Sequence, residues 1–248
     1  MIIISICLVS FVNFVVKMAH VNSEDGKMEA LPIYVVITGD FVGFSGLDRR
    51  IRQAMPGVMA GAGQCLREIL PGIMPHEISV FRGDSWQALI ADPVYALRAA
   101  VLIRTYIRVY IGHPKVDTRM AIGMGPVDYA PGNQVAAGDG EGFRRSGKML
   151  EKMASPKAGL LRYCYPDAPF EALVDALVRN IGELISAWRP LQARAVLGVL
   201  QGRTQAQIAS QWPHPISRQA VSKHLKNARW PAVSHGMQAF EDIHMTTI

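Results

Sequence analysis

Short apolar runs and helix-spaced apolar positions alternate along most of this chain, which predicts a mixed α and β protein. The run Tyr34-Val-Val-Ile-Thr-Gly-Asp40 has the apolar, β-branched composition of a buried strand. Between residues 77 and 91, apolar positions alternate on both sides of a Gly83-Asp84 tip, and this pattern predicts a β-hairpin. A further strand is expected over residues 118–122.

Helical spacing of apolar residues predicts the helices that separate these strands. They are expected over residues 47–70, 92–110 and 141–153, the first bent near Pro56 and the second with Pro93 in its first turn. The resulting order, β–α–β–β–α–β, is that of a split βαβ, ferredoxin-like sheet. On the second helix we expect Arg98, Arg104 and Arg108 to form a solvated face.

Beyond residue 155 the periodicity is helical only. One helix is expected over residues 170–188 as a connector, and Pro190 opens another over residues 191–200. Two short amphipathic helices follow, capped by Thr204 and Ser217 and separated by Pro213-His-Pro215. The predicted fold is therefore α+β, with a ferredoxin-like N-terminal domain over residues 31–155, a helical connector over 156–190, and an all-α helix-turn-helix domain over 191–248.

Residues 1–16 are almost wholly apolar, but a bilayer span needs about 20 such residues. No basic residue precedes the run, and Lys17 follows it without a small-residue cleavage site. We expect translation to start downstream, at Met18 or Met28, and the extension 1–30 to lie outside the fold. A weak N-terminal membrane anchor is the alternative; otherwise no membrane partner is expected.

Composition and charge favour a globular, cytoplasmic protein with a polyanionic partner. Half of the 248 residues are apolar and 19% are charged. From Glu183 onward, seven Lys or Arg face three Asp or Glu, which accounts for +4 of the net charge of +6. A merely basic surface is the alternative. The scattered cysteines and isolated histidines show no disulfide or zinc spacing, and we expect the histidines at the surface or in loops: His76, His113, His214, His224, His235 and His244.

The first candidate site is formed by two carboxylates. Asp40 would emerge where its strand ends, and Asp84 would lie beside it if the two strands are neighbours. With the backbone carbonyl of Phe41 they form a hard-oxygen set suited to Mg²⁺ or Mn²⁺ carrying a triphosphate. Gly43 and Gly46 relax the backbone, so that amides can converge on phosphate. The alternative is a strand with an ordinary turn. Trp86, nearby, is expected in the core, with base stacking as its alternative.

Here the sequence resembles a family. Asp40-Phe-Val-Gly43-Phe44-Ser45 and Gly83-Asp84-Ser85 resemble the two metal-aspartate motifs of class III adenylate and guanylate cyclases, over roughly residues 31–155. With the helical region behind it, the chain resembles SatD-like proteins. The resemblance implies a nucleotide site between the subunits of a homodimer, a purine nucleotide and a divalent metal. It implies metal contacts from Asp40, Phe41 and Asp84, and nucleotide contacts from Gly43, Phe44 and Ser45. Arg144, Arg145 and Lys148 are further cations that could meet the triphosphate, although their register is not that of the family.

The sequence departs from the cyclases in the residues that select the base and stabilise the transition state. Val80 stands where cyclases have a purine-selecting Lys, and residues 138–148 contain no Asn-x-x-x-Arg. Positioned charge supplies most of the catalytic power in nucleotidyl transfer. We therefore assign no catalytic residue and expect little or no cyclase activity.

The second candidate site is the helix that Ser217 caps. Its apolar residues Ala220, Val221 and Leu225 share one side, which leaves polar and basic side chains facing outward. The segment resembles the helix-turn-helix of bacterial transcription regulators, and this implies binding in the major groove of double-stranded DNA. The residues expected to contact DNA are Thr204, Gln205, Ser217, Arg218, Gln219, Ser222, Lys223 and Lys226. An amphipathic hairpin with a solvated basic face is the alternative.

Three hypotheses follow from these two sites. The first is a cytoplasmic DNA-binding transcription regulator whose cyclase-like domain senses a metal-nucleotide or mediates dimerisation. The second is an active class III nucleotidyl cyclase with an appended helix-turn-helix. The third is a structural dimerisation scaffold without a ligand.

Overall fold

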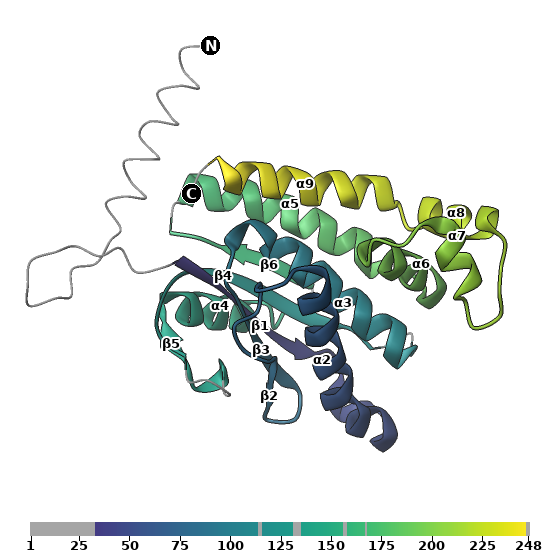
Figure 1. Cartoon of the computed structure of the whole chain (residues 1–248). Coiled ribbons are helices and arrows are strands. Elements are labelled where there is room, and N and C mark those ends of the chain that lie inside the picture. The colour runs from purple at the N-terminus through teal and green to yellow at the C-terminus, as the bar shows by residue number, and fades with distance from the viewer. Residues whose placement is uncertain (1–32, 114–115, 131–134, 156–157, 167, 247–248) are drawn as a thin grey trace, which may run out of the picture.

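The computed structural model describes residues 33–113, 116–130, 135–155, 158–166 and 168–246. The predictions for residues 1–17 and for the extension 1–30 lie outside these ranges. Within them, the chain is a mixed α and β protein, as predicted (Figure 1). Among the helices described, none is both long and apolar enough to cross a membrane.

A curled sheet forms the centre of the N-terminal region. Its strands run in the order β2-β3-β1-β4-β5, each antiparallel to its neighbour, and β6 pairs in parallel with the first part of β4. The hairpin predicted at residues 77–91 is formed by β2 and β3. Strand β4 extends past the predicted residue 122, and β6 was not predicted. The bounds are β1 Ile33–Phe41, β2 Ser79–Phe81, β3 Ser85–Ile90, β4 Thr118–Tyr129, β5 Asp139–Gly140 and β6 Leu161–Cys164.

The helices lie where the apolar periodicity predicts them, with shifts of a few residues at their ends. Only the last, α9, was not predicted as a separate element. Short 3₁₀ turns occupy Phe44–Gly46, Pro93–Tyr95 and Val135–Ala137. The helix bounds are α2 Arg49–Ile69, α3 Ala96–Ile111, α4 Glu141–Lys152, α5 Ala168–Ser186, α6 Pro190–Leu200, α7 Gln205–Ser210, α8 Arg218–Asn227 and α9 Trp230–Met245.

Both faces of the sheet are covered by helices. Successive strand residues point to opposite faces, so Val35 and Ile37 join the main core beneath α2 and α3, whereas Val36 joins a smaller cluster beneath α4. Gly123 lets α4 approach β4, because a Cβ atom there would lie 2.5 Å from the backbone nitrogen of Ser146. Helices therefore cover both faces of the sheet, and the strand ends are the parts of the sheet where a binding site can be exposed.

The C-terminal helices pack on the sheet region instead of standing apart from it. Buried residues of α5, α6 and α9, such as Val178, Val196 and Phe240, belong to the same core as Ile37 of β1. In Figure 1, α5 and α9 lie side by side above α3, and α6, α7 and α8 form the far end of this layer. One hydrophobic core thus joins the region predicted as a cyclase-like domain to the region predicted as a helix-turn-helix.

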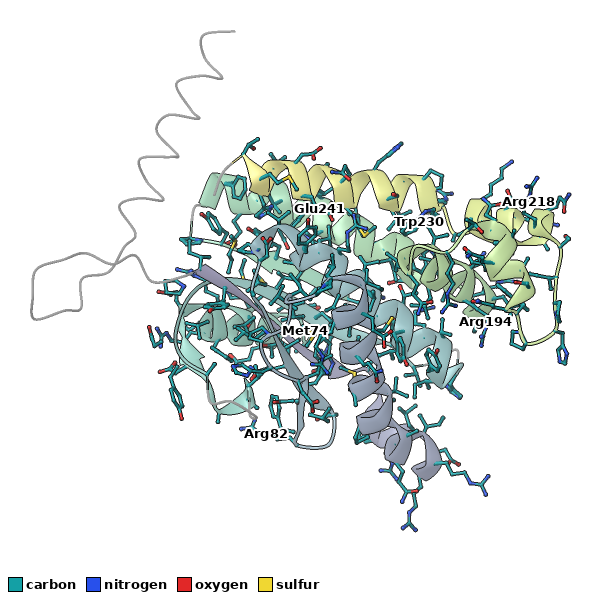
Figure 2. The ribbon with its side chains drawn as sticks, in the orientation of Figure 1. Met74, Arg82, Arg194, Arg218, Trp230 and Glu241 are labelled. Carbon is teal, nitrogen blue, oxygen red and sulfur yellow. The ribbon has the colours of Figure 1, made fainter. Side chains whose placement is uncertain are left out.

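The prediction of a solvated arginine face on α3 is wrong. Arg104 is fully buried and donates from Nε and Nη2 to the carboxylate of Asp117, both at 2.8 Å. Arg108 donates to Asp117 at 2.6 Å. Arg98 donates at 2.6 Å to Glu241, which Figure 2 labels on α9. Helical spacing identifies one apolar face, but α3 lies between the sheet and the C-terminal helices. Its arginines are therefore enclosed and need internal partners.

The prediction of a surface position for His244 is also wrong. This residue of α9 is 1% exposed, and its Nδ1 lies 2.7 Å from the carbonyl oxygen of Phe240. Its Nε2 lies 2.9 Å from the hydroxyl of Tyr163, on β6. Burial lowers the pKa of His244, so the ring is neutral near pH 7. The contact ties the end of α9 to the sheet.

Candidate functional site

The first site, which we call the Asp40 site, consists of Asp40, Phe41, Asp84 and Arg119 at one end of the sheet. Strands β1 and β3 are neighbours, and their register sets Asp40 opposite Ser85. The backbone N–H of Phe41 donates to the carbonyl oxygen of Asp84 at 3.0 Å, so the hairpin tip lies directly against the end of β1. The two predicted carboxylate residues are thus adjacent.

The carboxylate of Asp40 is already paired with a cation. Arg119 lies opposite Asp40 on β4 and donates from Nε to Oδ1 at 2.8 Å and from Nη2 to Oδ2 at 2.5 Å. This bidentate hydrogen bonding raises the pKa of Arg119, with a further contribution from the charge of Asp84. Sequence reasoning did not assign Arg119 a role, although it is the one charged side chain in the predicted strand 118–122.

At the Asp40 site, Arg119 competes with a divalent ion for the carboxylate of Asp40. Both carboxylate oxygens of Asp40 accept from the guanidinium, and Asp84 accepts from the hydroxyl of Ser85 at 3.3 Å. Within the described part of the chain, no group of three or more His, Cys, Asp or Glu side chains has a metal-binding arrangement. Mg²⁺ or Mn²⁺ at Asp40 would therefore have to compete with the positive charge and the hydrogen bonds of Arg119.

In the turn after β1, at least one of the amides predicted to bind phosphate donates its hydrogen bond within the turn itself. Gly43 has a φ of 65°, which a glycine adopts without strain, and the amide of Gly46 donates to the carbonyl of Gly43 at 3.0 Å. The ring of Phe44 stacks on Phe41, with centroids 6.0 Å apart, and Ser45 is exposed. The amide of Gly46 is therefore not directed at an outside anion.

Two of the three cations predicted to meet a nucleotide, Arg144 and Arg145, lie towards the other end of the sheet. Arg145 donates to the carbonyl oxygen of Met124 at 2.7 Å, and Arg144 pairs with Asp139 at 2.8 Å. Met124 is five residues along β4 from Arg119, a distance of about 16 Å at the usual rise per strand residue. Lys148 is exposed, one turn further along α4. The structure does not bring Arg144 and Arg145 to the Asp40 site.

Trp86, between these regions, packs in the core. It is fully buried, and its Nε1 donates to the hydroxyl of Thr118 at 3.0 Å. A Cβ atom on Gly39 would lie 2.4 Å from the Trp86 ring, so the glycine makes room for it. The indole is thus not exposed for stacking on a base.

The second site lies where α7 and α8 begin. Thr204 caps α7 by accepting from the amide of Gln207 at 3.3 Å, and Ser217 caps α8 by accepting from the amide of Ala220 at 3.1 Å. Ile208 of α7 packs against α6, where Gly198 leaves room, because a Cβ atom there would lie 2.6 Å from the Ile208 side chain. Both helices are thus short, capped and fixed from beneath.

One side of α8, which we call the α8 face, is exposed along its whole length. The amide of Ile216 donates to the carbonyl of Ala209 at 3.2 Å, which folds the connection back so that α8 begins beside α7. Among the residues that the structure describes, no acidic group pairs with the cations of this face. The α8 face consists of Arg218, Gln219, Ser222, Lys223 and Lys226.

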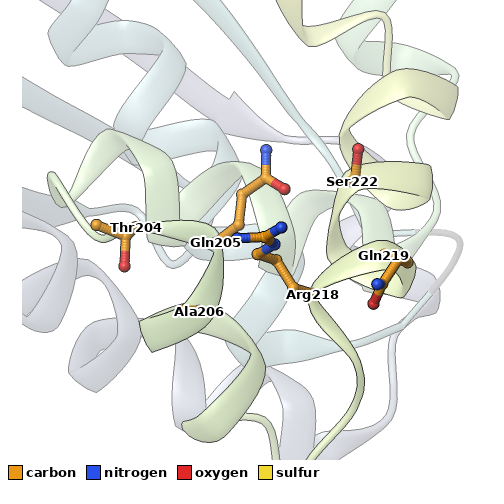
Figure 3. Close-up of a pocket in the computed structure, with 6 residues that line it drawn as sticks. All are labelled: Thr204, Gln205, Ala206, Arg218, Gln219 and Ser222. Atoms are coloured by element: carbon orange, nitrogen blue, oxygen red, sulfur yellow. The ribbon is translucent and has the colours of Figure 1, made fainter.

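An open groove of about 480 Å³ separates the starts of the two helices. In Figure 3 the side chain of Arg218 reaches towards Gln205, and Ser222 lies one turn further along α8. Ala206, which was not predicted, leaves the groove unobstructed because its side chain is a single methyl group. The groove is lined by Thr204, Gln205, Ala206, Arg218, Gln219 and Ser222.

No protein-family model, curated protein or solved structure matches this chain. The geometry of the two sites is therefore what bears on function.

Proposed function

We propose that this protein is a cytoplasmic DNA-binding transcription regulator, in which α7 and α8 form a helix-turn-helix. The observation that carries the proposal is the α8 face, where Arg218, Lys223 and Lys226 are exposed without an acidic partner in the described chain. Cations that the fold leaves unpaired in one helix-spaced row match the charge of a nucleic-acid backbone.

The position of each side chain suits a distinct contact. A helix fits the major groove of B-DNA, which is about 12 Å wide, and its first turn approaches the base edges. Arg218 and Gln219 occupy that turn and have the bidentate groups that read guanine and adenine. Lys223 and Lys226 lie further along, where the phosphates of one strand pass. Further contacts to the DNA backbone come from the residues at the helix starts, Thr204, Gln205 and Ser217.

The sheet region supports a sensing or pairing role better than catalysis. The strand order β2-β3-β1-β4 and the helices between these strands support our proposal of a split βαβ, ferredoxin-like sheet, the core expected of a cyclase-like domain. Asp40 and Asp84 lie together, but Arg119 occupies Asp40, and Val80 stands in place of a base-selecting Lys. In this proposal the region mediates homodimerisation or binds a purine nucleotide with Mg²⁺ or Mn²⁺, and the metal competes with Arg119 for Asp40.

The decisive experiment is selection of genomic fragments by the purified full-length protein, followed by titration of a selected fragment and of bulk DNA. The combined substitution of Arg218, Lys223 and Lys226 by Ala should abolish binding to both. A matched control removes three exposed cations from other helices, Arg50, Arg52 and Lys152, and should leave binding unchanged. The proposal fails if no fragment is preferred over bulk DNA, or if the control loses binding as the combined variant does.

A further inference from the structure

A largely buried carboxylate, with a side chain that is 13% exposed, lies two residues before Arg119 and is the centre of a polar cluster. Asp117 accepts three charge-assisted hydrogen bonds, two from Arg104 at 2.8 Å and one from Arg108 at 2.6 Å. Burial alone would raise the pKa of Asp117, but the hydrogen bonds and charges of the two arginines outweigh it and lower the pKa. The carboxylate is therefore ionised at neutral pH, inside the protein.

On one side this cluster reaches the Asp40 site. The carboxylate of Asp117 accepts from the amide of Thr118 at 2.9 Å, and the Thr118 hydroxyl donates to the carbonyl oxygen of Asp40 at 2.8 Å. The carbonyl of Asp117 accepts from the amide of Val42 at 2.9 Å. The first residues of β4 and the last residues of β1 thus share one hydrogen-bond network with Asp117.

On the other side the cluster reaches the C-terminal end of α8. Arg104 donates to the hydroxyl of Ser186, at the end of α5, at 2.8 Å. Arg108 donates to the carbonyl oxygen of Trp188. The indole Nε1 of Trp188, which is 2% exposed, donates to the carbonyl oxygen of Ala228 at 2.7 Å. Ala228 is the C-cap residue of α8.

We infer that this buried polar path, from the Asp40 site through Asp117, Arg108 and Trp188 to Ala228, positions α8 and couples DNA affinity to the Asp40–Arg119 pair. The inference rests on the proposed function, because its readout is DNA binding. Asp117 and Trp188 are positioning residues, since neither lies on the α8 face.

The energetics of buried charge explain why such a path can transmit a change. A buried ion pair is stable only while every charged group keeps its partners, and removing one partner leaves an expensive unpaired charge. If loss of the Asp40–Arg119 pair shifts β4, Arg104 and Arg108 have to move with Asp117 to keep their hydrogen bonds. Ser186 and Trp188, which accept from these arginines, then move as well. Coupling between two sites is reciprocal, so DNA bound at α8 would also change the Asp40 site.

The test is a double-mutant cycle measured as DNA affinity, at a temperature where every variant is fully folded. Asp40→Asn removes the charge that holds Arg119, and Trp188→Phe removes the indole N–H while keeping an aromatic ring. We expect Asp40→Asn to change DNA affinity by roughly threefold to tenfold in the wild-type background. In the Trp188→Phe background the same substitution should change it by less than about twofold. Trp212→Phe is the matched control, because Trp212 stacks on His224 of α8 but lies off the path, and should preserve the full response.

Amide hydrogen exchange in α8 provides a second readout that needs no DNA. Asp40→Asn should accelerate exchange in α8 in the wild-type and Trp212→Phe backgrounds, and should add nothing in the Trp188→Phe background. Additive effects of Asp40→Asn and Trp188→Phe in both readouts overturn the coupling while leaving DNA binding intact. If the protein binds no DNA, the proposed function and the coupling to DNA affinity fall together.

Discussion

The Asp40 site and the α8 face both gather charged side chains, but they differ in what those charges contact. At the Asp40 site the carboxylate is bound in two places by Arg119, and on the neighbouring α4 Arg144 is bound by Asp139. On the α8 face, Arg218, Lys223 and Lys226 pair with no acidic group of the described chain. Charged side chains that pair with each other within the chain stabilise the fold, whereas exposed cations without an acidic partner are available to a binding partner.

The first turn of α8 sharpens this difference. A helix N-terminus carries a partial positive charge, so acidic residues there are stabilising and cations are not. Helix α8 has no acidic residue in its first turn and begins with Arg218. The helix therefore gives up a few tenths of a kcal/mol of local stability or more by carrying Arg218 at that position. A phosphate group or an electron-rich base edge bound beside Arg218 would make the positive charge at this position stabilising.

The largest expected effect concerns the ion pair between Arg104 and Asp117. Arg104→Met removes the main partner of a buried carboxylate, Asp117, and should lower the free energy of unfolding by about 3–5 kcal/mol. Arg218→Ala is the matched loss of an exposed arginine and should change it by less than about 0.5 kcal/mol. Urea denaturation of the two variants measures both values. Equal losses of stability would contradict the distinction between paired and open charges.

The second expected effect concerns base recognition. Arg218→Ala should reduce the preference for a selected fragment over a fragment changed at one base pair by about 1–3 kcal/mol, because a bidentate contact to a base edge is lost. Gln219→Ala should do the same at a different base pair. Competition titrations with single-base-pair variants of the fragment measure this preference.

Lys223→Ala is the matched comparison for these two variants. A lysine on a phosphate should weaken binding to all fragments alike and reduce the slope of log affinity against log salt by about one. If Arg218→Ala and Lys223→Ala behave identically, the α8 face is only a solvated basic surface.

The third expected effect tests whether the Asp40 site can be opened. Arg119→Gln removes the cation that competes for Asp40, and the exposed part of such an ion pair is worth about 1 kcal/mol. Binding of Mn²⁺ with ATP or GTP should therefore tighten by roughly threefold to tenfold relative to the wild type. The measurement is a thermal shift at increasing Mn²⁺ with nucleotide present. The added substitution Asp40→Ala should remove the gain, and a gain that survives it would place the metal elsewhere.

Local sequence patterns predicted the elements of this fold well, because each is encoded within a few neighbouring residues. The helix at residues 47–70 and the hairpin at 77–91 follow from apolar spacing and from turn residues such as Gly83. Strand β6 was missed because Leu161–Cys164 is only four residues long and is stabilised by pairing with β4, which no local pattern reveals. Tertiary pairing, not propensity, forms it.

The candidate sites were predictable to different extents for the same reason. On α8 the exposed row follows from helical spacing, so its members could be listed from the sequence. At the Asp40 site the decisive residue is Arg119, which is 79 positions away and meets Asp40 only through the register of β1 and β4. The buried roles of Arg104 and His244 depend in the same way on which elements cover them. Sequence spacing does not encode these packing relations.

The last expected effect concerns His244, a buried residue that the folded chain holds in its neutral form. Burial lowers its pKa from the unfolded value of 6.5, so below about pH 6.5 the unfolded chain binds a proton at this residue that the folded chain does not. The free energy of unfolding should therefore fall as the pH decreases from about 7.5 to 5.5, by at most about 1.4 kcal/mol per pH unit from this one group. Asp117 does not contribute in this window, because its lowered pKa acts only below the unfolded value of 3.8.

His244→Gln isolates this contribution, because glutamine keeps a polar side chain but does not titrate. The variant should be less stable at every pH, since the contact with the hydroxyl of Tyr163 is altered, but its unfolding free energy should depend less on pH between 7.5 and 5.5. Urea denaturation at four or five pH values gives both curves. Parallel curves would mean that His244 is protonated in the folded protein as readily as in the unfolded chain. The contact between His244 of α9 and Tyr163 of β6 would then form with a charged imidazole as well. In that case the contrast between interior groups with internal partners and the unpaired cations of the α8 face would not extend to His244.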